Sequence, residues 1–519
     1  MPDESVSSSP QPDSSPPTAE LQPPSLQPAR SPLRELIAIA GPTVATMTSY
    51  TAMTFTDKWL VSRLDPELVG AQGNGGLASW VPQAFMYGTL QVINTYVSQN
   101  MGAGKASRGA AYAWNGIFIA AAFSLLLQPY ALLLPWIFEK AAMDPAQAGP
   151  ATEYGRILIW GCFLNMATRA LGQFFYGLHK AGIVMIAGIL ANIVNLVVSA
   201  MLVFGQDTSN RGLGLFGEMV AWLSATVGLE RGMGIAGSAW GTVIATGVEL
   251  SIPLAFFLSA KMHRQYGTRT SWRLSWPHIR DILRIGWPGG AMFANEMICW
   301  GFFMVYLVSH HGKAHASAGW ITHQYMSLSF MPAVGMSVAT TAIVGKYIGA
   351  GRHDLAAARY WLALGWTVAY MGLCALIFVV FRHQLIALFV KDGTPPEEVA
   401  ELVRLGSMML IATATFQIFD AGAMVTSGAL RGAGDTLFPG VATIVSSWLI
   451  IVGGGFALLY AFPGLESLGA WMAASAYIIV LCLLLLGRFL AGHWKTIKLL
   501  PGSAPAPAGD GVTDGITPP

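Results

Sequence analysis

Two stretches of this chain, one in each half, have closely similar sequences. The first is NMGAGKASRGAAYAW at 100–114, and the second is YIGAGRHDLAAARYW at 347–361. Each follows a long apolar segment, and each contains a basic loop that leads into another apolar segment. A chain that repeats itself at this scale is expected to fold as two similar bodies. The repeat therefore predicts two helical bundles that face each other across a central cavity, which is the arrangement a transporter requires.

The apolar character of the chain indicates a membrane protein. Hydrophobic residues make up 54% of the sequence and charged residues 11%, with a mean hydropathy of +0.52. A soluble fold would have to bury more apolar surface than it could, whereas a bilayer replaces the missing core. The formal net charge of +2 gives no reason to expect a nucleic acid partner.

Twelve segments contain the roughly 20 apolar residues that a helix needs to cross the hydrocarbon layer. Lysine and arginine concentrate in alternate loops, which by the positive-inside rule places both termini in the cytoplasm. The sequence therefore predicts an all-α membrane protein in which twelve transmembrane helices form two pseudo-symmetric six-helix bundles. The expected spans lie at about 35–63, 70–98, 112–138, 154–178, 183–205, 234–260, 281–309, 318–345, 360–390, 403–429, 436–461 and 467–490.

The division between the two halves is expected in the longest basic loop. Pro42 in the first span corresponds to Pro288 in the seventh, so the second half begins after residue 280. Loop 206–233 has no counterpart in the second half and is expected on the outer surface. The expected organisation is a disordered cytoplasmic tail at 1–32, an N-lobe at 33–260, a cytoplasmic inter-lobe loop at 261–280, a C-lobe at 281–490 and a cytoplasmic tail at 491–519.

Three acidic residues inside the expected spans are the main candidates for function: Asp57, Glu296 and Asp420. An ionised side chain at mid-bilayer costs about 2.5–3.5 kcal/mol, so such residues usually line a hydrated cavity or pair with a partner. Glu296 lies roughly 21 Å along its span at 1.5 Å per residue, which is near mid-depth. A hydrated carboxylate there exchanges protons or binds a cation. The alternative is a protonated carboxyl group that packs between helices.

Four uncharged polar residues in the spans have both structural and functional interpretations. Asn192 and Asn195 are three residues apart on one helix face, where amides either join helices or coordinate a cation. Gln99 and Gln324 are further polar candidates for the wall of a substrate cavity.

Arg169 in the fourth span is expected to neutralise either Asp57 or Glu249 in the sixth, and Arg169–Glu249 is the candidate structural charge pair. Helix packing and a role in transport are the alternatives for these two residues. The sequence contains no nucleophile–base arrangement, HExxH motif or Walker motif, so we expect neither an enzyme nor ATP hydrolysis. The expected energy source is a gradient of H⁺ or Na⁺. No cofactor and no dedicated metal site are expected, although Na⁺ is a candidate ligand of Glu296 and Asp420.

Several short motifs at corresponding places in the two halves carry a family resemblance. They are Pro42, Thr56-Asp57, SQNMGAG at 98–104, its repeat GKYIGAG at 345–351, and ALRGAGDT at 429–436. With these motifs the chain resembles the multidrug and toxic compound extrusion (MATE) transporters over about residues 34–490. The resemblance implies two six-helix lobes in a V shape that export organic cations in exchange for H⁺ or Na⁺.

The resemblance also implies roles for individual residues. Asp57 matches the acidic residue of the first span, Glu296 that of the seventh, Asp420 that of the tenth, and Asn195 the asparagine of the fifth. Many relatives have an acid or amide four residues after this asparagine, whereas this chain has Ser199. This departure shifts the expected ion-coupling site toward Glu296 and Asp420 in the second lobe.

The sequence is therefore interpreted as a monomeric antiporter of the plasma (bacterial inner) membrane. It is expected to contact membrane lipids and to export small organic, cationic molecules, whether drugs or toxic metabolites. A flippase for lipid-linked precursors, from the same wider superfamily, is the first alternative, and it would need a cavity dominated by arginine and lysine. A membrane-embedded enzyme is the second, and it would need a paired His/Asp or metal constellation near one interface. Neither pattern is visible in the sequence.

Overall fold

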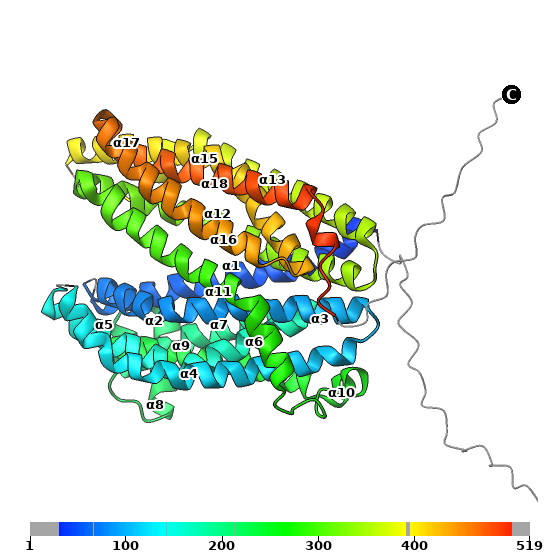
Figure 1. Cartoon of the computed structure of the whole chain (residues 1–519). Coiled ribbons are helices and arrows are strands. Elements are labelled where there is room, and N and C mark those ends of the chain that lie inside the picture. The colour runs from blue at the N-terminus through cyan, green and yellow to red at the C-terminus, as the bar shows by residue number, and fades with distance from the viewer. Residues whose placement is uncertain (1–30, 66, 142, 212, 391–394, 501–519) are drawn as a thin grey trace, which may run out of the picture.

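The computed structural model describes residues 31–65, 67–141, 143–211, 213–390 and 395–500 (Figure 1). Across these residues the backbone is almost entirely helical, and the one β-type contact is an isolated antiparallel bridge between Gly205 and Arg231. Helices satisfy every backbone hydrogen bond within one segment, which is what a lipid environment demands. The prediction of an all-α membrane protein is confirmed. Of the expected tails at 1–32 and 491–519, residues 1–30 and 501–519 lie outside the described residues.

The first half of the chain forms ten α-helices and two short 3₁₀ turns. They are α1 Pro32–Leu64, α2 Leu68–Leu90, α3 Val92–Gly102, η1 Ala106–Arg108, α4 Gly109–Lys140, α5 Pro145–Trp160, α6 Cys162–Gly177, α7 Ala181–Phe204, η2 Gln206–Arg211, α8 Gly214–Thr226, α9 Ile235–Phe257 and α10 Ala260–Tyr266.

The second half contains long α-helices, two π-helical segments (η3 and η5) and short 3₁₀ turns. They are α11 Trp276–Phe302, η3 Phe303–Val308, η4 Ser309–His311, α12 Lys313–Gly349, α13 His353–Val380, α14 Arg382–Ala387, α15 Pro396–Ala433, α16 Leu437–Ser446, η5 Ser447–Gly454, α17 Gly455–Ala461, η6 Pro463–Leu465, α18 Ser467–Leu490 and η7 His493–Lys495.

Among the described residues, nine helical segments are long and apolar enough to cross a membrane. The other three expected spans are helical but less regular or less apolar. The second is broken between α2 and α3 at Gln91, and the fourth between α5 and α6 at Gly161. The first, α1, carries Glu35, Asp57 and Lys58. The count of twelve membrane spans therefore stays a prediction.

The helices form two bundles that converge at the end that holds α3 and diverge toward the end that holds α5 and α17 (Figure 1). The core of the first bundle contains Phe174 and Phe257, and the core of the second contains Tyr360, Phe416 and Trp471. Each of these side chains is essentially inaccessible to solvent. Each bundle therefore has its own core, which is the arrangement needed for two bodies that move relative to each other.

Helices α1 and α11 cross from one bundle to the other. Leu36 at the start of α1 lies in the core of the second bundle, whereas Leu60 near its end packs against α7 and α8 of the first. In α11 the order is reversed, because Ile282 lies in the first core and Cys299 in the second. The two corresponding prolines, Pro42 and Pro288, lie between these contacts. The repeat thus includes a symmetric exchange of helices at the converging end.

The repeated glycine motif forms the tightest contact between the bundles. A Cβ atom at Gly102 would overlap the backbone oxygen of Lys346, and one at Gly349 would overlap the backbone oxygen of Gln99. Each copy of the motif therefore packs against the helix that carries the other copy. The two segments are similar for a physical reason. Each has a glycine, which carries no Cβ atom, at the position where the two helix backbones approach each other.

Adding a methyl group at this contact is expected to destabilise the protein. Gly102→Ala forces the Cβ into the backbone of α12, and overpacking of this kind costs about 1–3 kcal/mol. Gly182→Ala is the matched control, because a Cβ at Gly182 meets nothing within 4 Å. The melting temperature of the purified protein should fall in the first variant and stay the same or rise slightly in the second. Equal melting temperatures would show that the contact is not tight.

Candidate functional site

Asp57 lies in a buried polar cluster of the first bundle. It is on α1, and its carboxylate accepts hydrogen bonds from the hydroxyls of Thr242 on α9 (3.0 Å) and Ser199 on α7 (3.5 Å). The Asn195 amide donates to Ser199 (3.3 Å) and Thr242 (3.5 Å), while its Oδ1 atom is buried without a partner among the described residues. Three helices thus place a carboxylate, an amide oxygen and two hydroxyls together, all of them groups that bind a hard cation or a proton.

Ser199, the residue at which the sequence is expected to depart from the MATE pattern, contacts Asp57. The sequence argument singled out Asp57 and Asn195 but did not identify Thr242 as a partner. The chain offers no local signal for it, because Asp57 and Thr242 are 185 residues apart.

Arg169 and Glu249 are linked through Tyr50 rather than paired directly. The Tyr50 hydroxyl donates to Glu249 at 2.6 Å, and the Arg169 guanidinium lies 4.1 Å from the centre of the Tyr50 ring. Arg169 forms no ion pair among the described residues, since no carboxylate oxygen there lies within 4.0 Å of its guanidinium nitrogens. Cation–π contacts with Tyr50 and Tyr87 thus take the role expected of a salt bridge.

The other predicted polar residues have different surroundings. Asn192 donates to the backbone oxygen of Ser49 on α1 at 2.8 Å, so it joins two helices of the first bundle. Gln99 donates to the backbone oxygen of Gly432 at 2.9 Å and thus connects the bundles at their converging end. Gln324 is exposed on α12.

Glu296 and Asp420 are brought close together in the second bundle. They lie on α11 and α15, within electrostatic range of each other, and Glu296 is also in range of Arg431. Asp420 is 9% exposed. No hydrogen bond or ion pair joins either carboxyl group to another described residue. Glu296 is partly exposed. Two neighbouring carboxyl groups inside the bundle without fixed partners are suited to sharing a proton or a cation.

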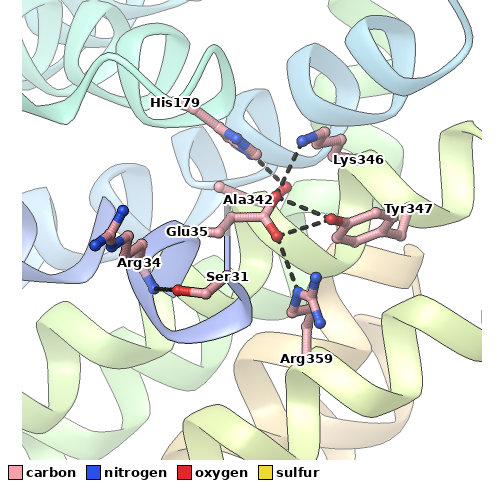
Figure 2. A network of polar contacts seen from close by, with 8 residues as sticks. All are labelled: Ser31, Arg34, Glu35, His179, Ala342, Lys346, Tyr347 and Arg359. Atoms are coloured by element: carbon pink, nitrogen blue, oxygen red, sulfur yellow. Dashed lines mark hydrogen bonds and ion pairs between the residues drawn. The ribbon is translucent and has the colours of Figure 1, made fainter. Parts of the chain in front are cut away.

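A second polar network at the converging end fastens the start of α1, the helix that continues into the first bundle, to α12 and α13 of the second (Figure 2). Glu35 on α1 accepts from Lys346 Nζ (3.0 Å) on α12, from Arg359 Nε (2.9 Å) on α13, and from the Tyr347 hydroxyl (2.7 Å to Oε2). Ser31 caps α1 just before this carboxylate by accepting from the Arg34 backbone amide. Arg359 belongs to the second copy of the repeat at 347–361, and Lys346 immediately precedes it. The sequence argument treated them only as topology signals and did not identify Glu35.

His179 adds a contact across the same interface. It lies between α6 and α7 with φ of +58°, and its Nε2 atom is 3.2 Å from the backbone oxygen of Ala342 on α12 (Figure 2). Burial and the nearby Lys346 ammonium lower the pKa of His179 to about 4. The neutral imidazole is therefore the form that fits the closed interface.

Acidification is expected to loosen this contact. The pKa of His179 is about 4 in the closed interface and 6.5 in water. Between these two pH values, a His179 side chain released into water binds more protons than one in the closed interface. The free energy that favours the closed interface therefore decreases as the pH falls from 6.5 to 4. A cysteine probe at Ala350 should become severalfold more reactive at pH 5 than at pH 7.5, once thiol ionisation is corrected for. His179→Gln should remove this pH dependence. An unchanged pH profile in that variant would contradict the assignment.

No group of three or more His, Cys, Asp or Glu side chains in the described part of the chain is arranged to hold a metal ion. The four cysteines are free thiols, so no disulfide links the helices. The polar features of the interior described so far are the Asp57 cluster and the Arg169–Tyr50–Glu249 cluster in the first bundle, the Glu296–Asp420 pair in the second, and the Glu35 network at the converging end.

The family-model comparison gives the same picture as this architecture. A model of the MatE family matches residues 42–201 and 291–455, which together make up more than half of the chain. The chain belongs to the MatE family. The two matched segments contain Asp57, Asn195, Glu296 and Asp420. The resemblance to MATE transporters is therefore confirmed.

Similar proteins agree with this membership. The "Probable multidrug resistance protein NorM" of Mesorhizobium japonicum is 27% identical over 471 residues, which cover 89% of this chain and 94% of that protein. Two solved structures share the fold at 18% identity. One is a MOP superfamily transporter from Pyrococcus furiosus (TM-score 0.76, 90% of this chain and 98% of that one). The other is the eukaryotic MATE transporter AtDTX14 (TM-score 0.74, 89% and 96%).

MatE proteins are transporters. This MatE protein is therefore a multi-pass membrane transporter and not an enzyme.

Proposed function

We propose that this MatE transporter is a secondary antiporter that exports drugs or toxic organic molecules, cationic ones in particular, in exchange for H⁺ or Na⁺. The similarity to multidrug resistance proteins supports the substrate class. The proposal rests chiefly on two neighbouring carboxyl groups without hydrogen-bond partners among the described residues, the buried Asp420 and the partly exposed Glu296. Such a pair takes up one positive charge readily and releases it when its surroundings change.

The contact of the two bundles at one end and their separation at the other support a mechanism of alternating access. The basic loops 103–108 and 350–352 follow α3 and α12, whose ends meet at the converging end, and the positive-inside rule assigns this end to the cytoplasm. The bundles are closed there by the Glu35 network and diverge at the opposite end. We infer an outward-facing state of a monomer in the bacterial inner membrane, with both termini cytoplasmic and with 33–260 and 281–490 as the two lobes.

The coupling step follows from the positions of the carboxyl groups. A proton or Na⁺ from outside reduces the negative charge of the Glu296–Asp420 pair by one, which weakens the attraction for a bound organic cation. The substrate then leaves outward, and the less charged pair is cheaper to bury when the outer end closes. The Asp57 cluster is a second candidate ion site, since it offers carboxylate, hydroxyl and amide oxygens.

A gradient comparison in proteoliposomes tests this function. Vesicles loaded with a fluorescent organic cation should release it through the protein when a gradient of one coupling ion is imposed, and not when both gradients are absent. An imposed pH gradient and an imposed Na⁺ gradient, tested separately, identify the ion. Export that needs neither gradient, or that proceeds equally in protein-free vesicles, would contradict the proposal.

A further inference from the structure

A cavity on the cytoplasmic edge of the first bundle has no role in the transport scheme. Its volume is about 530 Å³, and it lies between the start of α4, the connection 267–275 and the start of α11. Figure 1 draws this region at the margin of the molecule, next to α10. The polar part of its wall is formed by Arg108, Tyr112, Thr270, Ser271, His278 and Asp281.

The wall of this cavity is rigidly built. The Trp114 indole donates to the backbone oxygen of Thr268 at 2.7 Å, and the Asn115 side chain accepts from the Ser275 backbone amide at 2.9 Å. The Tyr112 ring lies edge-on to the His278 ring at 4.7 Å, and its hydroxyl donates to Asp281 Oδ2 at 3.0 Å. These contacts fasten the connection and the start of α11 onto α4. The cavity is thus a preformed feature rather than a gap beside a loose loop.

The wall carries one unpaired charge of each sign. Arg108 immediately precedes α4, and its guanidinium makes no hydrogen bond or ion pair with the described residues. It lies where the α4 N-terminus adds a favourable field for an anion. Asp281 has one carboxylate oxygen, Oδ1, without a hydrogen-bond partner among the described residues. The hydroxyls of Thr270 and Ser271 both donate to the Gly267 backbone oxygen, which leaves their lone pairs free to accept.

The segment 272–276, which joins the lining residues Ser271 and Pro277, is suited to a lipid surface. Trp272, Leu274 and Trp276 are 62%, 69% and 70% exposed, and Arg273 lies among them. Exposed tryptophan next to arginine is typical of segments that lie at the level of lipid headgroups. This segment therefore offers acyl chains an apolar surface beside a headgroup that enters the polar cavity.

We propose that this cavity binds the headgroup of an ethanolamine phospholipid from the cytoplasmic leaflet. The phosphate pairs with Arg108, and the ammonium group donates to Asp281 and to the Thr270 and Ser271 hydroxyls. The bound lipid holds the start of α11 on α4. Because α11 crosses from one bundle to the other, the lipid fixes one end of this crossing helix. This inference needs only the proposed orientation in the membrane, and it is independent of the transported substrate and of the coupling ion.

Native mass spectrometry of the full-length protein, titrated with single lipids, tests the proposal. We expect one phosphatidylethanolamine to bind at least about tenfold more tightly than phosphatidylcholine, which lacks an N–H donor, or phosphatidylglycerol, which lacks the ammonium group. Arg108→Gln and Asp281→Asn should each weaken this binding about tenfold. The matched control is the double variant Arg352→Gln, Asp354→Asn, which removes one charge of each sign at an exposed cytoplasmic ion pair outside the cavity.

Two results would overturn the proposal. The first is equal binding of the three lipids, or ethanolamine lipid binding that survives Arg108→Gln unchanged. The second is full competition by free phosphoethanolamine at the concentration of the lipid, which would indicate a site for a soluble ligand. Melting temperatures of the lipid-free variants close to that of the parent protein establish that any loss of binding reflects the site rather than misfolding.

Discussion

Replacing Glu296 with glutamine and Asp420 with asparagine in one variant is expected to abolish ion-driven export. The amides keep the size and polarity of the side chains but cannot bind a proton, and they attract a cation far less. Because each carboxyl group can substitute for the other in holding one charge, single variants should retain part of the activity. Export driven by an imposed gradient should fall in the double variant to the level of protein-free vesicles.

The fold of this double variant should be intact. Each ionised carboxylate inside the bilayer costs about 2.5–3.5 kcal/mol, so its removal relieves strain rather than adding it. The melting temperature should therefore be equal to that of the parent protein or higher. Asp57→Asn provides the comparison in the first bundle, since it alters the Asp57–Thr242–Ser199 cluster and leaves the second bundle unchanged. Normal export by the Glu296/Asp420 variant would move the coupling site to Asp57.

Replacing Glu35 with glutamine is expected to open the cytoplasmic end. The carboxylate holds Lys346, Tyr347 and Arg359 together, and its side chain is only 13% exposed. The amide keeps one acceptor oxygen but loses the charge, so two basic groups face each other without compensation. The loss of charge-assisted hydrogen bonds of this kind costs about 1–3 kcal/mol, which shifts the equilibrium toward the inward-open state by about 5- to 150-fold.

Spin-label distances measure this shift directly. Labels at Lys105 and Ala358, both exposed and at the cytoplasmic ends of opposite bundles, should report a longer distance in Glu35→Gln than in the parent protein. Arg352→Gln is the control, because the Arg352–Asp354 ion pair lies within the second bundle and does not cross the interface. Identical distance distributions for Glu35→Gln and the parent protein would show that the network does not maintain closure.

Much of the architecture was predictable from local sequence properties. The apolar segments and the repeat at 100–114 and 347–361 indicated a two-part helical membrane protein, and the family motifs indicated its relatives. Irregular helices were harder to predict, because the breaks at Gln91 and Gly161 occur inside continuous apolar runs. The crossing of α1 and α11 between the bundles was not predicted, since no sequence signal states which core a helix end enters.

The sequence predicted the individual acidic residues of the candidate site but not the residues that surround them. The acids stood out because charge is costly in lipid, but their partners were found only in the fold. Arg169 was expected to pair with Glu249, whereas Tyr50 separates them. Glu35 was passed over because it lies at the end of a span, where a charge needs no explanation. Its partners Lys346 and Arg359 follow it by 311 and 324 residues.

The sequence by itself determined that this protein lies in a membrane, that it is helical, that its halves are related, and which acids are placed at membrane depth. These properties depend on local hydrogen bonds and on the cost of moving each residue into lipid, and both can be read along the chain. Only the tertiary structure decided which helices exchange bundles, which groups surround each carboxylate and which end is closed. Those outcomes depend on the rotation and approach of helices that are distant in sequence, and packing of the whole molecule sets them.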